Sequence, residues 1–431
     1  MRVDQHYEPT YRREVVAPLL ESIKKGYCHT VVSVRGMGLG PLFKFLRLHP
    51  VIKELVSPDN FEFSLINFDE VSPLNQKQFL KEFLRDLRSI LVTNAVQKNQ
   101  YIEVEYARGI ASEDEHEVLY SIKNLLQVSM EADIRIVVLL QEFDEVARRD
   151  NTLLNTLFTL HQLFDHHLLY IFGVHTFPDR LRLGEPTKFD YIFQQYIVQK
   201  PFSLEGFLGH YKNHFAEDGL HLDDSQLKLI HSYTGGFASY NRFLSPSLSN
   251  ASLDTLEESL KEQIPSPQMA LRSRQLLIDL TIDEVQALHA LCLGHKVPES
   301  RLKTLKELGL VIDKNGLFSP IFREHLRAES QIGTGLRIDT EAKKVFIDDV
   351  ELSLFLSPIE FKFLAYLYEH KNTVCDREKV IEFAWGGHPE GVSDEAVDQL
   401  VSRLRSKLLA QTGRGDLITT VRGHGFTLNQ S

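Results

Sequence analysis

Residues 393–408, SDEAVDQLVSRLRSKL, decide the fold of the C-terminal part of the chain. Ser393 can cap a helix, and the two acidic residues that follow it place negative charge at the positive end of the helix dipole. Apolar side chains then recur on one face with the period of a helix, at Val397, Val401, Leu404 and Leu408. The opposite face is polar. We therefore predict a helix that packs on one side and can contact another molecule on the other.

Two further helices and two sets of strands flank this helix. Ser357-Pro-Ile-Glu360 has the form of a capping box with proline at the first helical position, and Asp376 can cap a second, shorter helix. Residues 336–354 alternate in short apolar runs, which is typical of small strands. Residues 417–428 have the pattern of a hairpin with glycines at its tip. Together these elements predict an α+β winged helix-turn-helix over residues 336–431.

The motifs of this segment form an ordered series: Leu356-Ser-Pro-Ile-Glu-Phe361, Val374-Cys-Asp-Arg377, Ala384-Trp385, Val397-Asp398, Ser402-Arg-Leu-Arg405 and Thr419-Thr-Val-Arg-Gly-His-Gly-Phe426. The series resembles the C-terminal DNA-binding domain of OmpR/PhoB-type response regulators. In that family the third helix enters the major groove and an arginine of the wing reaches an adjacent minor groove. The resemblance assigns these roles to Arg403 and Arg422, and phosphate contact or helix support to Arg405 and Thr420. The full set of predicted DNA-binding residues is Gln399, Ser402, Arg403, Arg405, Lys407, Thr420 and Arg422.

The charge of this segment is uneven. Residues 336–431 carry twelve Lys and Arg against fifteen Asp and Glu, a formal balance of −3. From Gln399 onward, however, five basic residues face only Asp416, a local balance of +4. We therefore expect the basic side of the domain to be the DNA side. The alternative is a winged helix that contacts protein instead of DNA.

A glycine-rich loop follows a predicted strand near the N-terminus. The apolar run Thr30-Val-Val-Ser-Val-Arg-Gly36 leads into Gly36-Met-Gly-Leu-Gly40, and a helix then begins. This segment resembles the phosphate-binding loop of STAND/Orc-type AAA+ ATPases. A working loop ends in Gly-Lys-Ser/Thr, because lysine bridges the terminal phosphates and the hydroxyl holds Mg²⁺. In one register the last three positions are Pro41, Leu42 and Phe43, and in the shorter register the lysine and hydroxyl positions are Pro41 and Leu42.

The residues that follow a second predicted strand also differ from those of active ATPases. Residues 134–140 are apolar except for Arg135, a pattern typical of a buried parallel strand. In relatives the next two residues are an aspartate that holds Mg²⁺ and a glutamate that polarises the attacking water. Here they are Gln141 and Glu142. We therefore predict a pseudo-ATPase that is not an enzyme and holds no cofactor or metal, with ATP binding doubtful. The degenerate nucleotide site comprises Gly36, Gly38, Gly40, Pro41, Leu42, Gln141 and Glu142.

The pattern along the chain predicts four parts. Alternating strands and helices favour a parallel sheet, and Tyr233-Thr-Gly-Gly-Phe237 resembles the helical lid of such ATPases. The fold class expected is thus a P-loop-like AAA+/STAND α/β sheet with lid and winged helix, followed by the C-terminal winged helix-turn-helix. The expected parts are the ATPase-like domain with its lid at 1–250, a winged-helix-like domain at 251–328, a linker at 329–335 and the DNA-binding domain at 336–431.

Composition sets further limits. The chain has 431 residues and a net charge of −11, which argues against nonspecific polyanion binding by the molecule as a whole. Its three cysteines are isolated, so they indicate neither a disulfide framework nor a zinc site. The sequence shows no signal peptide and no membrane-length apolar run, so we expect a cytoplasmic protein without a membrane partner.

These observations favour a transcription regulator. Its C-terminal winged helix would read double-stranded promoter DNA, and its inactive ATPase-like module would mediate homo-oligomerisation or sense a signal or a protein partner. One alternative is a STAND-type nucleotide-dependent switch with residual ATP binding. Another is an interaction scaffold in which both winged helices bind protein.

Overall fold

A computed structural model shows two compact units, Met1–His325 and Leu326–Ser431, each of which is described by itself. The structure describes residues 7–68, 76–94, 96–97, 99–149, 151–181, 193, 195–217, 221–244, 253–312, 316–331, 336–340, 343–347, 350–352, 356–371, 373–386, 392–412, 417–421 and 424–428. Within these ranges no helix combines the length and apolar character that a membrane span requires.

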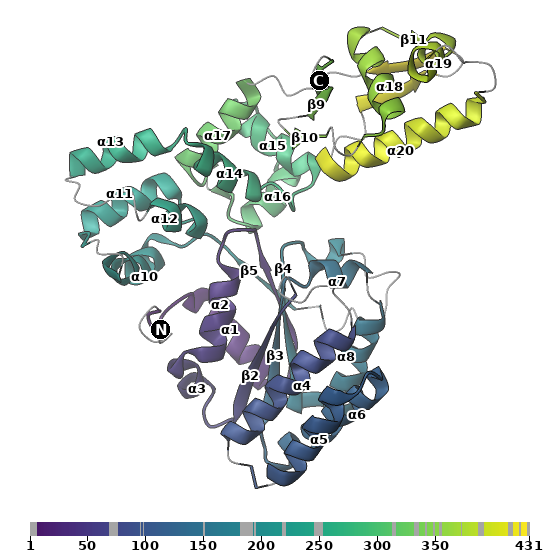
Figure 1. Ribbon diagram of the computed structural model, residues 1–431. Helices are drawn as coiled ribbons and strands as arrows, with labels where there is room; N and C mark the ends of the chain where they lie inside the picture. Colours follow the sequence, from purple (N-terminus) through teal and green to yellow (C-terminus); the bar gives the residue numbers. More distant parts are fainter. Residues whose placement is uncertain are drawn as a thin grey trace. The chain divides into compact units, whose positions relative to one another are not determined.

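The first unit is organised around a parallel sheet of five strands (Figure 1). In spatial order the strands are β2 (Phe61–Asn67), β3 (Arg135–Gln141), β4 (Leu168–Val174), β1 (His29–Ser33) and β5 (Tyr196–Gln199). Every neighbouring pair is parallel. All residues of β1 and β4 are buried, as expected for strands covered on both faces. The predicted parallel sheet is confirmed.

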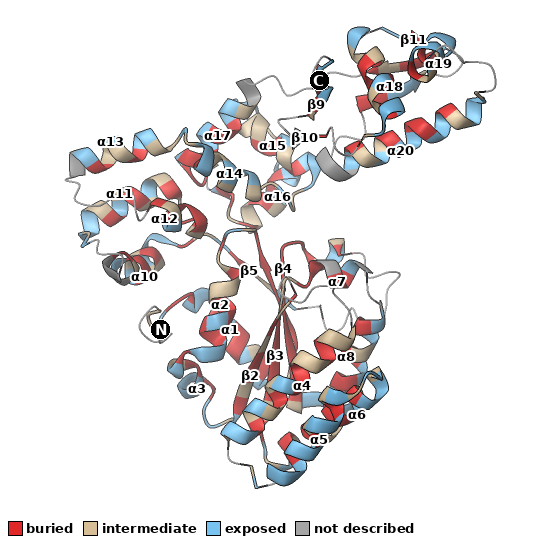
Figure 2. Cartoon of the chain, viewed as in Figure 1, coloured by how far each residue is buried: buried red, intermediate tan, exposed pale blue. Residues whose placement is uncertain are grey.

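Helices cover both faces of this sheet, with their buried sides turned toward it (Figure 2). One face carries α1 (Arg13–Lys24), α2 (Leu39–Leu48) and α3 (Pro50–Val56). The other carries α4 (Gln76–Thr93), α6 (Glu115–Glu131) and α8 (Asn151–Phe164), with α5 (Asn99–Ala111) packed on α4 and α6. Three short helical segments lie next to strands β3 and β4. The helix α7 (Asp144–Arg149) follows β3, the 3-10 turn η2 (Asp165–His167) precedes β4, and the 3-10 turn η3 (Pro178–Arg180) follows β4.

A group of helices follows the sheet in the chain. It comprises α10 (Leu204–Glu217), α11 (Asp224–Thr234), α12 (Ala238–Leu244), α13 (Leu253–Gln263) and α14 (Pro267–Gln275). Gly235 and Gly236 join α11 to α12 with positive φ angles of 62° and 78°. A Cβ on either would collide with a backbone carbonyl, that of Phe318 or of Phe202. Only glycine fits this junction, so the Thr-Gly-Gly-Phe motif marks the lid as predicted.

The first unit ends in a small winged helix. It consists of α15 (Ile282–Cys292), α16 (Glu299–Glu307), the hairpin strands β6 (Val311–Ile312) and β7 (Gly316–Leu317), and the first residues of α17 (Pro320–Gln331), because the unit ends at His325. Thr281 and Glu284 form the capping box of α15, because each side chain bonds the backbone N–H of the other residue. The predicted lid and winged helix are therefore both present. α17 continues to Gln331, and residues 332–335 of the predicted linker lie outside the described residues.

The second unit is the predicted winged helix-turn-helix. Its first sheet is antiparallel and contains β8 (Leu336–Asp339), β9 (Lys344–Ile347) and β10 (Val350–Glu351). The helices are α18 (Pro358–Glu369), α19 (Arg377–Trp385) and α20 (Asp394–Thr412). A second antiparallel sheet joins β11 (Cys375–Asp376) and β12 (Ile418–Val421) to the central β13 (Gly425–Leu428). The predicted Ser357–Glu360 capping box begins α18.

Candidate functional site

Helix α20 has the two faces that the sequence predicted. Its buried stripe contains Val397, Val401, Leu404 and Leu408, together with Leu400, which is only 3% exposed. Gln399, Ser402 and Arg403 are exposed on the other side. Arg403 forms no ion pair with a described residue, so its guanidinium is available to a partner. Arg422, the predicted wing contact, lies outside the described residues.

Arg405 and Thr420 act together in the second unit. The Nε atom of Arg405 donates to the carbonyl oxygen of Ile418 at 2.9 Å, and its terminal nitrogen donates to Oγ1 of Thr420 at 2.9 Å. Arg405 lies on α20, whereas Ile418 and Thr420 lie on β12. This arginine therefore joins the third helix to the wing sheet and orients the exposed Thr420 hydroxyl.

Lys407 is engaged with a buried carboxylate. Its Nζ donates to Oε2 of Glu360 at 2.7 Å, and Glu360 is only 3% exposed. Burial alone would raise the pKa of Glu360, but the hydrogen bonds from Lys407 and Ser357 hold that pKa below its ordinary value. The charge of Lys407 thus neutralises a core carboxylate, which makes this residue a support of the fold.

We expect Lys407→Met to destabilise the second unit by about 2 kcal/mol, because Glu360 would keep its burial but lose its charged donor. Urea unfolding followed by the fluorescence of Trp385, the single tryptophan, measures this loss. Adding Glu360→Gln to Lys407→Met is expected to restore part of the stability, since glutamine can still serve the capping box. The matched control Lys379→Met, on exposed α19 surface, is expected to change stability by less than about 0.5 kcal/mol. Equal losses in the two single variants would contradict the prediction.

In the first unit, the predicted degenerate nucleotide site comes together at the carboxyl ends of β1 and β3. Gly36 and Gly38 have φ angles of 83° and 98°, and α2 begins directly after them. A Cβ on Gly40 would lie 3.2 Å from Nε2 of Gln141, so the Gln141 amide packs against this loop. Leu42, at the position of a catalytic lysine or hydroxyl, is fully buried in the core. The loop geometry is present, and Leu42 offers neither a cation nor a metal ligand at its position.

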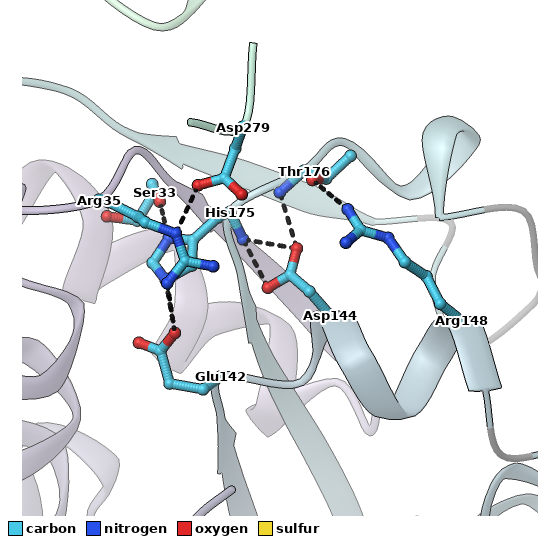
Figure 3. Close-up of polar contacts among 8 residues, drawn as sticks. All are labelled: Ser33, Arg35, Glu142, Asp144, Arg148, His175, Thr176 and Asp279. Carbon is cyan, nitrogen blue, oxygen red and sulfur yellow. Dashed lines mark hydrogen bonds and ion pairs between the residues drawn. The ribbon is translucent and has the colours of Figure 1, made fainter. Parts of the chain in front are cut away.

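A polar network that the sequence did not predict lies beside this loop (Figure 3). The His175 ring, after β4, donates from Nε2 to Oε2 of Glu142 at 2.6 Å, and its Nδ1 faces the carbonyl oxygen of Ser33. Arg35 lies 3.6 Å from Glu142 and 2.8 Å from Asp279, a residue between α14 and α15. The network therefore connects the ends of three strands to the segment that precedes the small winged helix.

The contacts of His175 identify its charge state. Both ring nitrogens face oxygen acceptors, an arrangement that favours the imidazolium form with a hydrogen on each nitrogen. Burial opposes this charged form, but the hydrogen bond and charge of Glu142 outweigh it and raise the pKa of His175 above 6.5. Glu142 is thus paired with His175 within the protein.

We expect the contribution of His175 to stability to fall with rising pH. A folded-state pKa raised above the unfolded value gives stabilisation that is complete below about pH 6.5 and is lost as pH rises through the folded pKa. The loss of stability caused by His175→Gln is therefore expected to be larger at pH 6 than at pH 9. Urea unfolding followed by far-UV circular dichroism at both pH values checks this. A pH-independent effect would indicate a neutral imidazole.

Asp144 holds the neighbouring loop. Its carboxylate accepts hydrogen bonds from the backbone N–H of His175, at 2.9 and 3.0 Å, and from that of Thr176 at 3.0 Å. Arg148 in turn donates to Oγ1 of Thr176. Asp144 is 3% exposed. The signal that could have found these residues is their position, because polar residues that directly follow parallel strands meet at one edge of the sheet.

A cavity of about 750 Å³ opens next to the loop. Loop residues 34–41, together with Gln141, Glu142 and His175, form one wall. The opposite walls come from the N-terminal segment and from helices α10, α12 and α14. The predicted degenerate site is thus one wall of this cavity, and the N-terminal segment and the helices α10, α12 and α14 form the others.

Comparisons with known proteins divide the chain in the same way. Residues 351–428 match the protein family described as "Transcriptional regulatory protein, C terminal". The chain is 37% identical over 93 residues to the transcriptional regulatory protein PrrA of Mycobacterium leprae, which is 22% of this chain and 38% of PrrA. It is 36% identical over 94 residues to the response regulator ArlR of Staphylococcus aureus, 22% of this chain and 41% of ArlR. The match thus spans 38% to 41% of the length of these relatives.

Two solved structures align with about three quarters of the chain. The Walker-type ATPase PABY2304 of Pyrococcus abyssi aligns with a TM-score of 0.44 and 15% identity, covering 74% of this chain and 97% of that one. The ORC2 protein of Aeropyrum pernix aligns with a TM-score of 0.45 and 14% identity, covering 74% and 92%.

Proposed function

We propose that this chain is a transcription regulator that binds promoter DNA through α20 and the β12–β13 wing. The premise is that residues 351–428 are an OmpR/PhoB-type DNA-binding domain. The observation that carries the proposal is the exposed polar face of α20. Gln399, Ser402 and Arg403 project from a helix whose other side is buried in the domain core. A helix anchored in this way can lie in the major groove, where polar and basic side chains reach base edges.

The arrangement suggests different roles for the predicted contacts. Arg403 is exposed and is assigned to base or phosphate contact, because nothing in the described part of the domain neutralises it. Arg405 holds the wing and presents the Thr420 hydroxyl to a phosphate. Lys407 neutralises Glu360, so its contribution to DNA affinity is small. The DNA surface is therefore narrower than the basic residues of the sequence suggested.

The experiment is a titration of the full-length chain against DNA fragments from its own promoter region over a range of salt concentrations. We expect the logarithm of the association constant to fall linearly with the logarithm of salt concentration, with a slope of about −0.9 for each phosphate contacted. Two domains on repeated half-sites would add their contacts, which favours binding as a homo-oligomer. Absence of any salt-sensitive DNA affinity would overturn the proposed function.

For the first unit we propose a pseudo-ATPase that mediates oligomerisation or senses a signal or a partner. Three observations support this role. The lysine position holds Leu42 or, in the shorter register, Pro41, and the hydroxyl position holds Phe43 or Leu42. Leu42 is buried. The aspartate position holds Gln141. Glu142, which could polarise water in an active enzyme, is bound to the protonated His175.

The rival function is a nucleotide-dependent switch, which the retained glycine loop geometry favours. Calorimetric titration of the full-length chain with ATP, with Mg²⁺ and with EDTA, separates the two. We expect no affinity for ATP that depends on Mg²⁺, because the metal has no carboxylate or hydroxyl ligand at this loop. Tight binding that requires Mg²⁺, or release of phosphate, would favour the switch.

A further inference from the structure

The cavity in the first unit has an unusual distribution of charge. Arg35 and the protonated His175 are balanced by Asp279 and Glu142 within the network of Figure 3. Two other lining arginines, Arg242 on α12 and Arg272 on α14, form no ion pair with a described residue. Arg272 donates to Oγ of Ser239 at 2.9 Å and has a buried Nε without a hydrogen-bond partner among the described residues. The lid side of the cavity therefore carries uncompensated positive charge.

The wall contributed by the N-terminal segment and α10 is aromatic. Tyr7, Tyr11, Phe202, His210 and Tyr211 line the cavity. The His210 side chain is buried, with 7% of its surface exposed, and its Nδ1 has no hydrogen-bond partner in the described part of the chain. Burial lowers the pKa of His210 to about 3, so its ring is neutral. The neutral His210 ring stacks on Tyr7 and on Phe202, with centroid distances of 5.7 and 5.5 Å, and so is part of the aromatic wall.

The opposite wall limits the charge of a ligand. The loop has no lysine, and the side chain of Gln141 packs against Gly40. The carboxylate of Glu142 also lines the cavity on this side. Arg35 and His175 already face Asp279 and Glu142, so a triphosphate without its metal would meet no unpaired cation among the described residues of this wall. A smaller anion could instead lie at the lid side, near Arg242 and Arg272.

We propose that this cavity binds a planar aromatic compound carrying a single carboxylate or phosphate monoester group, held by Arg242 and Arg272 and without a divalent cation. The volume of about 750 Å³ is within the range of small-molecule sites. The aromatic wall receives the ring, and the two guanidinium groups receive the anion through charge-assisted hydrogen bonds. This inference names a ligand class for the sensing role proposed above, and only its regulatory meaning rests on that role.

The test is calorimetric titration of the full-length chain in EDTA with four probes. Two are planar aromatic anions, 2-naphthoate and 2-naphthyl phosphate, which represent the two anionic groups. The others are 2-naphthamide, which is planar but neutral, and decalin-2-carboxylate, which is charged but not planar. We expect at least one planar anion to bind about tenfold or more tightly than both controls, with no change when Mg²⁺ is added.

Variants assign the binding to the two arginines. Arg242→Gln/Arg272→Gln is expected to weaken binding of the planar anion by about tenfold or more and to leave 2-naphthamide within about twofold. Arg242→Gln alone, at an exposed position, tests the same point if the double variant fails to fold. The matched control is Arg274→Gln, which lies on α14 but does not line the cavity.

Three results would overturn the proposal: no binding of either planar anion at millimolar concentration, equal binding of the amide, or binding that requires Mg²⁺. These titrations contain no DNA. If neither planar anion binds but DNA binding still depends on salt, only the ligand proposal is rejected. If a planar anion binds but no salt-dependent DNA binding is found, only the proposed DNA-binding function is rejected.

Discussion

Arg403→Ala is expected to weaken binding of the full-length chain to its promoter DNA by about 10- to 100-fold, the cost of one well-placed base contact. Arg403 is exposed on α20 and has no ion-pair partner among the described residues, so its loss should not disturb the fold. The measurement is a binding titration at fixed salt, with competitor DNA of unrelated sequence to separate specific from nonspecific affinity. Unchanged unfolding followed by Trp385 fluorescence would show that the domain is intact.

The matched control is Lys371→Ala, which removes a positive charge from the turn after α18, outside α20 and the wing. Its effect on affinity is expected to be small. If Lys371→Ala lowers affinity as much as Arg403→Ala does, then net charge and not α20 determines binding. If neither variant changes affinity while the domain still binds a protein partner, the winged helix serves protein contact.

Asp144→Ala is expected to destabilise the first unit by about 3 kcal/mol or more. The alanine would leave the buried N–H groups of His175 and Thr176 without their acceptor, and each unsatisfied buried group costs about 1–3 kcal/mol. Urea unfolding followed by far-UV circular dichroism reports the first unit together with the second. Trp385 fluorescence reports the second unit alone, because the chain has one tryptophan and it lies there.

Two variants complete this test. Asp144→Asn keeps one acceptor oxygen and is expected to lose less stability than Asp144→Ala. Asp224→Ala removes a surface carboxylate that is 62% exposed and pairs with Lys212, and we expect a change below about 1 kcal/mol. Two results would contradict the role assigned to Asp144. In one, Asp144→Ala leaves the urea midpoint measured by circular dichroism unchanged. In the other, it shifts the midpoint measured by Trp385 fluorescence as much as the midpoint measured by circular dichroism.

The elements that the sequence predicted best are those whose determinants lie within one helical turn. The capping box at Ser357–Glu360 uses side chains three residues apart, and the structure contains it. The buried stripe of α20 follows from the helical period alone. Leu400 shows the limit of this reasoning, because the period leaves the width of the stripe open and the surrounding domain buries this residue as well.

Contacts between distant parts of the chain could not be predicted in the same way. Glu360 and Lys407 are 47 residues apart, and only the packing of α18 against α20 brings them together. Arg35, Glu142, His175 and Asp279 come from four separate segments. In the sequence, only Arg35, Glu142 and His175 share a feature, since each of them follows a strand.

The sequence by itself determined the parallel sheet in the N-terminal part and the winged helix-turn-helix at the C-terminus, since these depend on residue type and local spacing. The tertiary structure decided how the charges are used. It neutralises Lys407 with Glu360 and Glu142 with His175, and it leaves Arg242, Arg272 and Arg403 without an ion pair among the described residues. The physical reason is that electrostatic energy depends on distance and burial in space, which spacing along the chain does not specify.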